Sequence, residues 1–71
     1  MKDRNGCEIQ LNDYILYLNS YLEKVVEINN LDDRIYVCFD NNIYRSVLQQ
    51  FHMWGVIKLS EEDAIMWKLE R

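Results

Sequence analysis

Few side chains in this sequence could bind a metal or attack a substrate. His52 is its one histidine, and Cys7 and Cys38 are its two cysteines. None of these residues forms a closely spaced pair of the kind typical of zinc ligands, and a structural zinc site uses four ligands. His52 also has no serine or cysteine signature beside it that would make it the base of a nucleophile. The sequence therefore predicts no metal site and no nucleophilic catalysis, and it indicates a half-exposed His52 at the edge of an aromatic cluster.

The acidic side chains gather in two short groups, which are Asp32 with Asp33, and Glu61 with Glu62 and Asp63. Catalytic carboxylate pairs need a cleft that pushes their pKa values apart, and a chain of 71 residues has little room for one. We expect the first group to be a solvated turn and the second to be the start of a helix. The two glycines, Gly6 and Gly55, stand alone, so no glycine-rich loop could hold a phosphate. We therefore expect a protein that is not an enzyme and uses no cofactor.

Length, composition and charge narrow the class further. The 71 residues suffice for one small domain over 1–71, and a hydrophobic content of 49% is enough for a compact core. The net charge is −4 and the Lys and Arg residues are scattered, whereas nucleic acids and anionic membranes attract clustered cations. No apolar run is long enough to span a bilayer, and the first residues lack the pattern of a signal peptide. We expect a cytoplasmic protein with free, half-buried thiols, or with a Cys7–Cys38 disulfide if their strands are adjacent.

Asn5-Gly6 is the strongest short-range hairpin signal in the chain. A type I′ turn needs positive φ at both central residues, which Asn and Gly tolerate best. Short strands at 1–4 and 7–10 would pair across this turn.

The stretch 13–28 fits two incompatible structures. A helix capped by Asn12 or Asp13 explains apolar residues that recur at spacings of three and four, namely Ile15, Leu18, Leu22 and Val25. The alternative is a meander with Asn12 in the left-handed conformation, and this segment is rich in Tyr, Ile and Val, which prefer strands. The meander consists of strands at 14–18, 21–28 and 34–40, a turn at Asn19-Ser20 and a loop at 29–33. We favour the meander, because it gives every strand a neighbour.

The last third of the chain is predicted less sharply. A helix over 42–54, with Asn42 as its cap, would place Ile43, Val47, Phe51 and Trp54 on one face; the rival is a strand at 43–47 followed by a loop. A short strand at 56–59 follows. Ser60 and the acidic residues after it indicate a C-terminal helix over about 61–70. The fold class is therefore mainly β or α+β, a small antiparallel SH3-like barrel or twisted meander with one or two short helices.

The beginning of the chain also resembles a known group of proteins. The residues that carry the resemblance are Asp3, Asn5, Gly6, Ile9, Asn12, Asp13, Ile15 and Tyr17, in the pattern D-x-N-G-x-x-I-x-x-[G/N]-D. This pattern is similar to the opening of small SH3-like barrel proteins of phages and prophages, such as the YopX-like phage proteins, and the resemblance covers residues 3–40. The chain departs from the pattern at Asn12, where Gly is preferred. The resemblance implies a twisted sheet that closes on itself and removes exposed strand edges, and it transfers no catalytic residues.

Large apolar residues near the C-terminus are the candidates for binding a partner. Aromatic residues and Met are enriched at protein interfaces, and a helix or strand can bury only some of the positions in "FHMW". At least one of Phe51, Met53 and Trp54 should therefore stay partly outside. The predicted partner-binding residues are Phe51, Met53, Trp54, Trp67, Asp32, Asp33, Glu61 and Glu62.

These observations predict a non-enzymatic accessory protein of a phage or prophage that binds a host protein. Stoichiometric inhibition of a host enzyme or defence system, as in anti-CRISPR-like proteins, needs only a rigid complementary surface. The acidic groups would steer such an inhibitor to a basic groove on a nucleic-acid-handling enzyme. Two alternatives stay open. One is a small nucleic-acid-binding barrel whose stacking platforms would be Tyr14, Tyr17, Tyr21, Tyr36 and Tyr44. The other is an obligate homodimer with a purely structural role.

Overall fold

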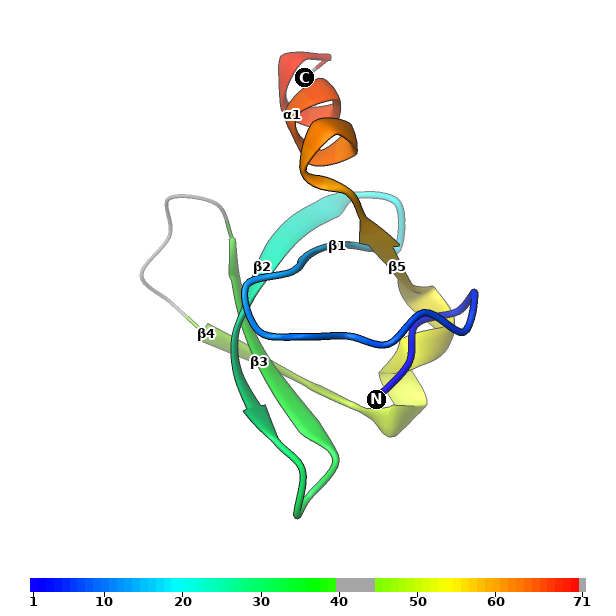
Figure 1. Ribbon diagram of the computed structural model, residues 1–71, viewed down its shortest axis with the longest axis vertical. Helices are drawn as coiled ribbons and strands as arrows, with labels where there is room; N and C mark the ends of the chain where they lie inside the picture. The colour runs from blue at the N-terminus through cyan, green and yellow to red at the C-terminus, as the bar shows by residue number, and fades with distance from the viewer. Residues whose placement is uncertain (40–44, 71) are drawn as a thin grey trace.

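Antiparallel strands are the main elements of this protein, for which a computed structural model describes residues 1–39 and 45–70. The elements are β1 (Tyr14–Tyr17), β2 (Tyr21–Asn29), β3 (Arg34–Phe39), β4 (Arg45–Gln49), the 3₁₀ helix η1 (Gln50–Gly55), β5 (Val56–Leu59) and α1 (Glu61–Leu69). The described strands form one five-stranded sheet in the order β4-β3-β2-β1-β5, which bends into a barrel-like shape (Figure 1). The predicted fold class, a small mainly-β or α+β domain, is confirmed.

The meander over 13–28 is confirmed and the single helix is wrong. Tyr14 of β1 lies opposite Lys24 of β2 in an antiparallel register. Leu18 and Asn19 have φ angles of 54° and 57°, which no right-handed helix contains. The turn therefore centres on Leu18-Asn19, one residue earlier than the predicted Asn19-Ser20. Asn12 has φ 71°, as the meander requires.

The core lies on the concave face of the sheet. Its fully buried side chains are Ile15, Val25, Ile35, Val37 and Val56. Along β3, Ile35 and Val37 are two positions apart, whereas their partners on β2, Ile28 and Val25, are three apart. A β-bulge between Val25 and Glu27 absorbs the extra residue, so that both strands direct apolar side chains to the same face.

The turn at Asn5-Gly6 is present, but it is not type I′. Gly6 has φ 84°, whereas Asn5 is absent from the residues with positive φ. The backbone N–H of Asp3 donates to the Cys7 carbonyl at 2.9 Å, and that of Gly6 donates to the Asp3 carbonyl at 3.1 Å. This closes a three-residue turn with Gly in the left-handed position. Of the strands expected on either side, only an isolated bridge between Lys2 and Glu8 forms.

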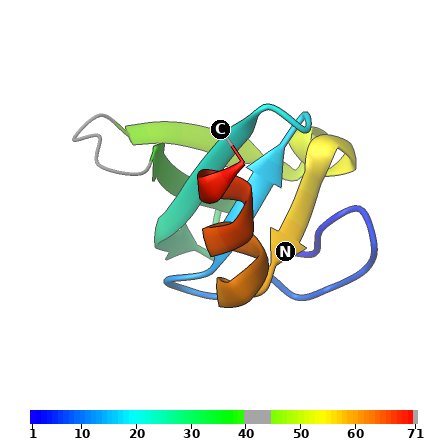
Figure 2. The same cartoon turned by 90° about the horizontal axis from the view of Figure 1, so that it is seen from above.

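The second half of the chain follows the strand alternative. β4 and η1 occupy most of the segment for which a helix over 42–54 was the first option, so that helix is wrong; Asn42, its expected cap, lies outside the described residues. β5 has the predicted bounds. Helix α1 begins as expected, with the Ser60 hydroxyl accepting a hydrogen bond from the Asp63 N–H at 3.1 Å. It packs against β1 and β5 on the face opposite the core (Figure 2), where Ala64 is buried.

The resemblance implied a sheet that closes on itself and has no exposed edges, but the described sheet keeps two edge strands, β4 and β5. Within 1–39 and 45–70, β4 pairs with β3 alone and β5 with β1 alone. The N-terminal loop, residues 1–13, covers the outer edge of β5, because the Arg4 N–H donates to the Val56 carbonyl at 2.9 Å. Cys7 and Cys38 are both free, and Cys7 is exposed rather than half-buried. None of the described helices is long and apolar enough to cross a membrane.

Candidate protein-binding surface

The short helix η1 separates its large side chains onto two sides. A 3₁₀ helix has three residues per turn, so residues three apart lie one above the other. Phe51 and Trp54 have this spacing, and their side chains are 66% and 68% exposed. Met53 is 4% exposed and belongs to the core. Phe51 and Trp54 therefore form an aromatic pair on the outer side of η1, anchored from within by Met53.

His52 holds the start of η1 in place. Its Nδ1 atom accepts a hydrogen bond from the Gln49 backbone N–H at 2.8 Å. Its ring lies 4.1 Å from the Phe51 ring, centroid to centroid, and meets the Tyr17 ring edge-on at 6.2 Å. His52 is half-buried within this aromatic cluster, as predicted. The cluster limits the freedom of the Phe51 ring, which lowers the entropy that binding would cost.

The turn between β1 and β2 packs on the other end of η1. The Leu18 N–H donates to the Gly55 carbonyl at 2.8 Å. A Cβ atom on Gly55 would lie 2.8 Å from Leu18 Cδ2 and 3.3 Å from Tyr17 Cε1, so this close approach requires glycine. Leu18 is itself 42% exposed. We call the exposed apolar residues Leu18, Phe51 and Trp54 the apolar patch; they come from two segments, distant in the chain, that meet at Gly55.

Leu18 occupies a backbone conformation that leucine disfavours. Its φ of 54° is in the left-handed region, which costs a residue with a Cβ atom roughly 1–2 kcal/mol. Such strain persists where the surroundings impose it and is common at functional sites. Asn19 beside it suits the same conformation far better.

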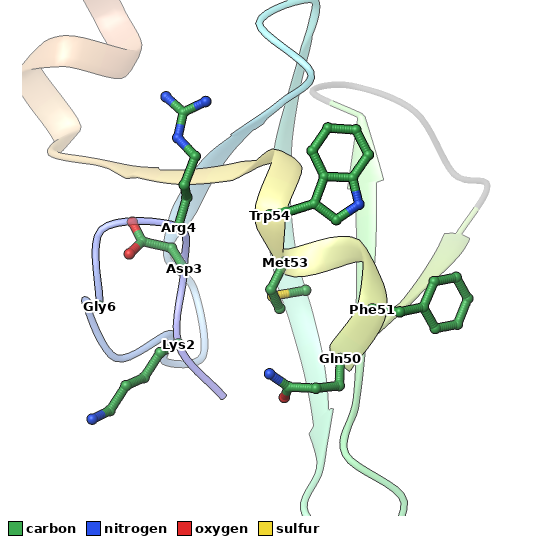
Figure 3. Close-up of a pocket in the computed structure, with 8 residues that line it drawn as sticks. All are labelled: Lys2, Asp3, Arg4, Gly6, Gln50, Phe51, Met53 and Trp54. Atoms are coloured by element: carbon green, nitrogen blue, oxygen red, sulfur yellow. The ribbon is translucent and has the colours of Figure 1, made fainter.

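A shallow groove of about 580 Å³ separates η1 from the N-terminal loop (Figure 3). The loop lines it with Lys2, Asp3 and Arg4, and η1 with Gln50, Met53 and the aromatic pair. Figure 3 shows Met53 between the loop and the helix, whereas Phe51 and Trp54 project from the helix on the side away from the loop. The groove therefore has an apolar floor, one cationic wall and one aromatic rim.

Asp3 fixes the backbone of the cationic wall through its hydrogen bonds. Its Oδ1 atom accepts hydrogen bonds from the backbone N–H groups of Asn5 at 2.9 Å and Cys7 at 2.8 Å. Its Oδ2 atom accepts one from the Lys58 N–H at 2.7 Å. Burial alone would raise the pKa of Asp3, but these hydrogen bonds outweigh it and lower the pKa below its ordinary value. The ionised carboxylate thus ties the loop to β5.

The predicted partner-binding residues do not all meet. Phe51 and Trp54 are brought together as described, which confirms that part of "FHMW" stays outside. Met53 was expected at the interface, and this is wrong, because the side chain fills the core under η1. Trp67 is half-buried on α1.

The two acidic groups lie on separate elements. Asp32 and Asp33 are exposed in the turn between β2 and β3, and Glu61 and Glu62 are exposed at the start of α1. In Figure 1 the β2–β3 turn and α1 are at opposite ends of the molecule. The two acidic groups are therefore not parts of one small site.

Three residues of this surface were missed by the sequence reasoning. Lys2 and Arg4 lie next to Asp3 in the chain, but nothing in their types shows that Asp3 turns its charge inward. Leu18 carries no signal either, because a leucine in a left-handed turn contradicts its own preference.

In the described ranges, 1–39 and 45–70, no three His, Cys, Asp or Glu side chains gather as ligands for a metal ion.

Comparisons with known proteins return no match to a protein-family model, a curated protein or a solved structure. The resemblance to YopX-like phage proteins therefore stays a prediction.

Proposed function

We propose that this protein acts by binding another protein through the apolar patch of Leu18, Phe51 and Trp54. The observation that carries the proposal is the exposure of Phe51 and Trp54, at 66% and 68%, side by side on one turn of helix. Aromatic residues in such clusters dominate the binding energy of protein interfaces. The patch also sits on a rigid base, since Met53 and the Leu18–Gly55 contact hold η1 from both sides.

The energetics of a small domain support this choice. A domain of 71 residues has little stability to spare, and burying one large apolar side chain contributes about 1.5–3 kcal/mol. Phe51 and Trp54 are nevertheless about two-thirds exposed, and the strained Leu18 packs on the same short helix at Gly55. Scattered exposed apolar residues are ordinary, but a rigid cluster of them is typical of an interaction site.

The wider role that fits is stoichiometric inhibition. A standard interface takes about 800 Å² from each partner, which one face of this domain can supply. Such a protein blocks a host enzyme or defence system by occupying a surface, without chemistry of its own. Together with the resemblance to phage proteins, this favours an accessory protein of a phage or prophage that acts in the host cytoplasm.

Nucleic-acid binding is supported less well. Tyr14, one of the expected stacking platforms, faces the Nζ atoms of Lys24 and Lys68, 5.8 Å and 5.1 Å from its ring centroid. The Tyr17 ring meets His52, and Tyr44 lies outside the described residues. Tyr14 and Tyr17 thus contact side chains of the protein itself, which disfavours their use as platforms for stacked bases.

Affinity capture with matched variants tests the proposal. The tagged protein, a Phe51→Ser/Trp54→Ser variant and a Leu31→Ser control are used as baits in lysate of the native host. Leu31 is 96% exposed in a turn away from the patch, so its replacement removes apolar surface without touching the site. A partner held by the parent and by Leu31→Ser, and lost from the double variant, is the expected result. Equal capture by the double variant would show that the patch is not the binding surface.

A further inference from the structure

We infer that the segment bound at this surface is an acidic peptide stretch of the partner, with carboxylates placed against Lys2 and Arg4 and an apolar side chain against the aromatic pair. This inference rests on the proposed function and names the chemistry of the partner. It also reverses the expectation that the acidic groups of this protein seek a basic groove, because the apolar patch lies next to cations.

The distribution of charge is the first argument. Although the net charge is −4, Lys2 and Arg4 are exposed and form no ion pair with any described residue. Beside them, the N-terminal ammonium of Met1 pairs with Glu8 at 3.1 Å, and farther away Arg45 pairs with Glu27 at 3.3 Å and Lys58 with Asp13 at 3.1 Å. The groove is thus a local cationic region on an acidic molecule, next to its largest exposed aromatic residues.

The role of Asp3 is the second argument. Its sequence position between Lys2 and Arg4 would ordinarily neutralise part of their charge. In the structure its oxygens are taken up by the backbone N–H groups of Asn5, Cys7 and Lys58, and the residue is 6% exposed. The carboxylate keeps its negative charge but makes no ion pair with Lys2 or Arg4 among the described contacts, so both cationic side chains stay exposed for a ligand.

The placement of the loop is the third argument. The Arg4 N–H donates to the Val56 carbonyl at 2.9 Å, and the Asp3 carboxylate holds the Lys58 N–H. These bonds fix the backbone on which both cations stand relative to η1. The loop backbone is therefore already in position, which reduces the entropy lost on binding. The bound segment contacts Lys2 and Arg4 on the loop and crosses η1 to reach the aromatic rings on its far side (Figure 3).

The dimensions favour a short peptide segment. A groove of about 580 Å³ is in the range that holds a few side chains, between roughly 300 and 1,000 Å³. A nucleic-acid strand would need a longer cationic track than two residues, and the net charge of the protein is −4. In a peptide segment with carboxylates next to an apolar residue, the carboxylates match Lys2 and Arg4, and the apolar side chain matches the aromatic pair.

Selection from a library of random 12-residue peptides tests this inference. The parent protein is the bait, and the selected peptides are then measured by fluorescence anisotropy against three variants. Lys2→Gln/Arg4→Gln removes the cations. Phe51→Ser/Trp54→Ser removes the aromatic pair. Lys24→Gln/Lys68→Gln is the control, which removes the same number of charges from β2 and α1, where both side chains lie over the Tyr14 ring.

We expect peptides enriched in Asp and Glu beside Trp, Phe or Leu. Their affinity should fall about tenfold in Lys2→Gln/Arg4→Gln, and that variant should also lose most of the salt dependence, since exposed ion pairs are screened by salt. The Lys24→Gln/Lys68→Gln control should bind like the parent.

Other outcomes separate the two proposals. Neutral or basic peptides that still depend on Phe51 and Trp54 would overturn the acidic-segment inference and leave the proposed function standing. Peptides that bind the parent and both double variants with equal affinity would overturn both proposals. A single-stranded oligonucleotide, dT12, serves as the second probe: if it binds more tightly than any selected peptide and requires Lys2 and Arg4, the ligand is nucleic acid and the inference is wrong.

Discussion

The carboxylate of Asp3 and the backbone N–H of Lys58 are joined by a 2.7 Å hydrogen bond across 55 positions of the chain. The bond connects the N-terminal loop to the edge of β5, which no other strand of the described sheet covers. The same carboxylate accepts two more hydrogen bonds inside its own turn. The Asp3 side chain thus holds the N-terminal loop over the edge of β5 and fixes the backbone that carries Lys2 and Arg4.

Replacing Asp3 should therefore loosen both the fold and the groove. Asp3→Asn keeps the shape but places an amide donor where backbone donors converge, and we expect the free energy of unfolding to fall by about 2 kcal/mol. Urea denaturation at pH 7 measures the change. Asp32→Asn, in the exposed β2–β3 turn, is the control and should stay within about 0.5 kcal/mol of the parent. A loss equal to that of the control would mean that the Asp3–Lys58 bond contributes nothing to stability.

Acid should expose the same interaction. Because the pKa of Asp3 in the folded protein is below its ordinary value of 3.8, its contribution to stability is complete above that pH. It is lost as the pH falls through the lowered folded value. The parent should lose stability between pH 4 and pH 2 more steeply than Asp3→Asn, as followed by thermal unfolding in circular dichroism.

Glu23 should make stability depend on pH in the opposite direction. It lies on the core face of β2, 4% exposed, and its Oε2 atom has no hydrogen-bond partner among the described residues. Burial raises its pKa from 4.5 to about 7. The unfolded chain ionises first as the pH rises, so stability is complete below about pH 4.5 and falls until about pH 7, by up to about 3 kcal/mol.

Glu23→Gln tests this dependence, because it keeps the size of the side chain and cannot ionise. The variant should match the parent near pH 4 and exceed its stability at pH 8, as measured by urea midpoints across that range. A parent whose stability is flat from pH 5 to pH 8 would show that the Glu23 carboxylate is not held in an apolar environment. An unchanged pH profile in the variant would assign the dependence to another group.

Local patterns in the sequence predicted much of the fold. The β-branched and aromatic content of 14–28 and the turn tolerance of Asn12 correctly favoured strands over a helix whose periodicity was equally regular. Ser60 and the acids after it located α1 almost to the residue. The turn at Leu18 was displaced by one position, because the packing of Leu18 on Gly55 is a tertiary contact that no local preference encodes.

The candidate site was less predictable for the same reason. The sequence shows that "FHMW" cannot be wholly buried, but which side chain enters the core depends on the three-residue period of η1 and on where β4 ends. The expected helix over 42–54 would have placed Phe51 and Trp54 on one face with Ile43 and Val47. In η1 Phe51 and Trp54 again share one side, which faces outward, and Met53 faces the core.

Leu18 offers a test of whether strain is kept for function. Leu18→Asn relieves the strain of positive φ but removes the packing of the leucine on Gly55, so we expect the two effects to offset and stability to stay within about 1 kcal/mol of the parent. Binding to the partner or to selected peptides should weaken, because the variant removes one side of the apolar patch. Parallel measurements of urea denaturation and peptide affinity check both effects. A loss of stability with full affinity would make Leu18 a residue of the fold rather than of the interface.

The neighbouring residues Met53 and Trp54 should separate stability from binding most clearly. Met53 fills the core at 4% exposure, so Met53→Ala should lower the free energy of unfolding by about 2–4 kcal/mol. Trp54 is 68% exposed, and Trp54→Ala should change stability by less than about 1 kcal/mol while it weakens peptide binding about tenfold or more. Urea denaturation and fluorescence anisotropy with a labelled peptide measure the two quantities on the same samples. If Trp54→Ala costs as much stability as Met53→Ala, the indole supports the fold, and the apolar patch loses its principal anchor.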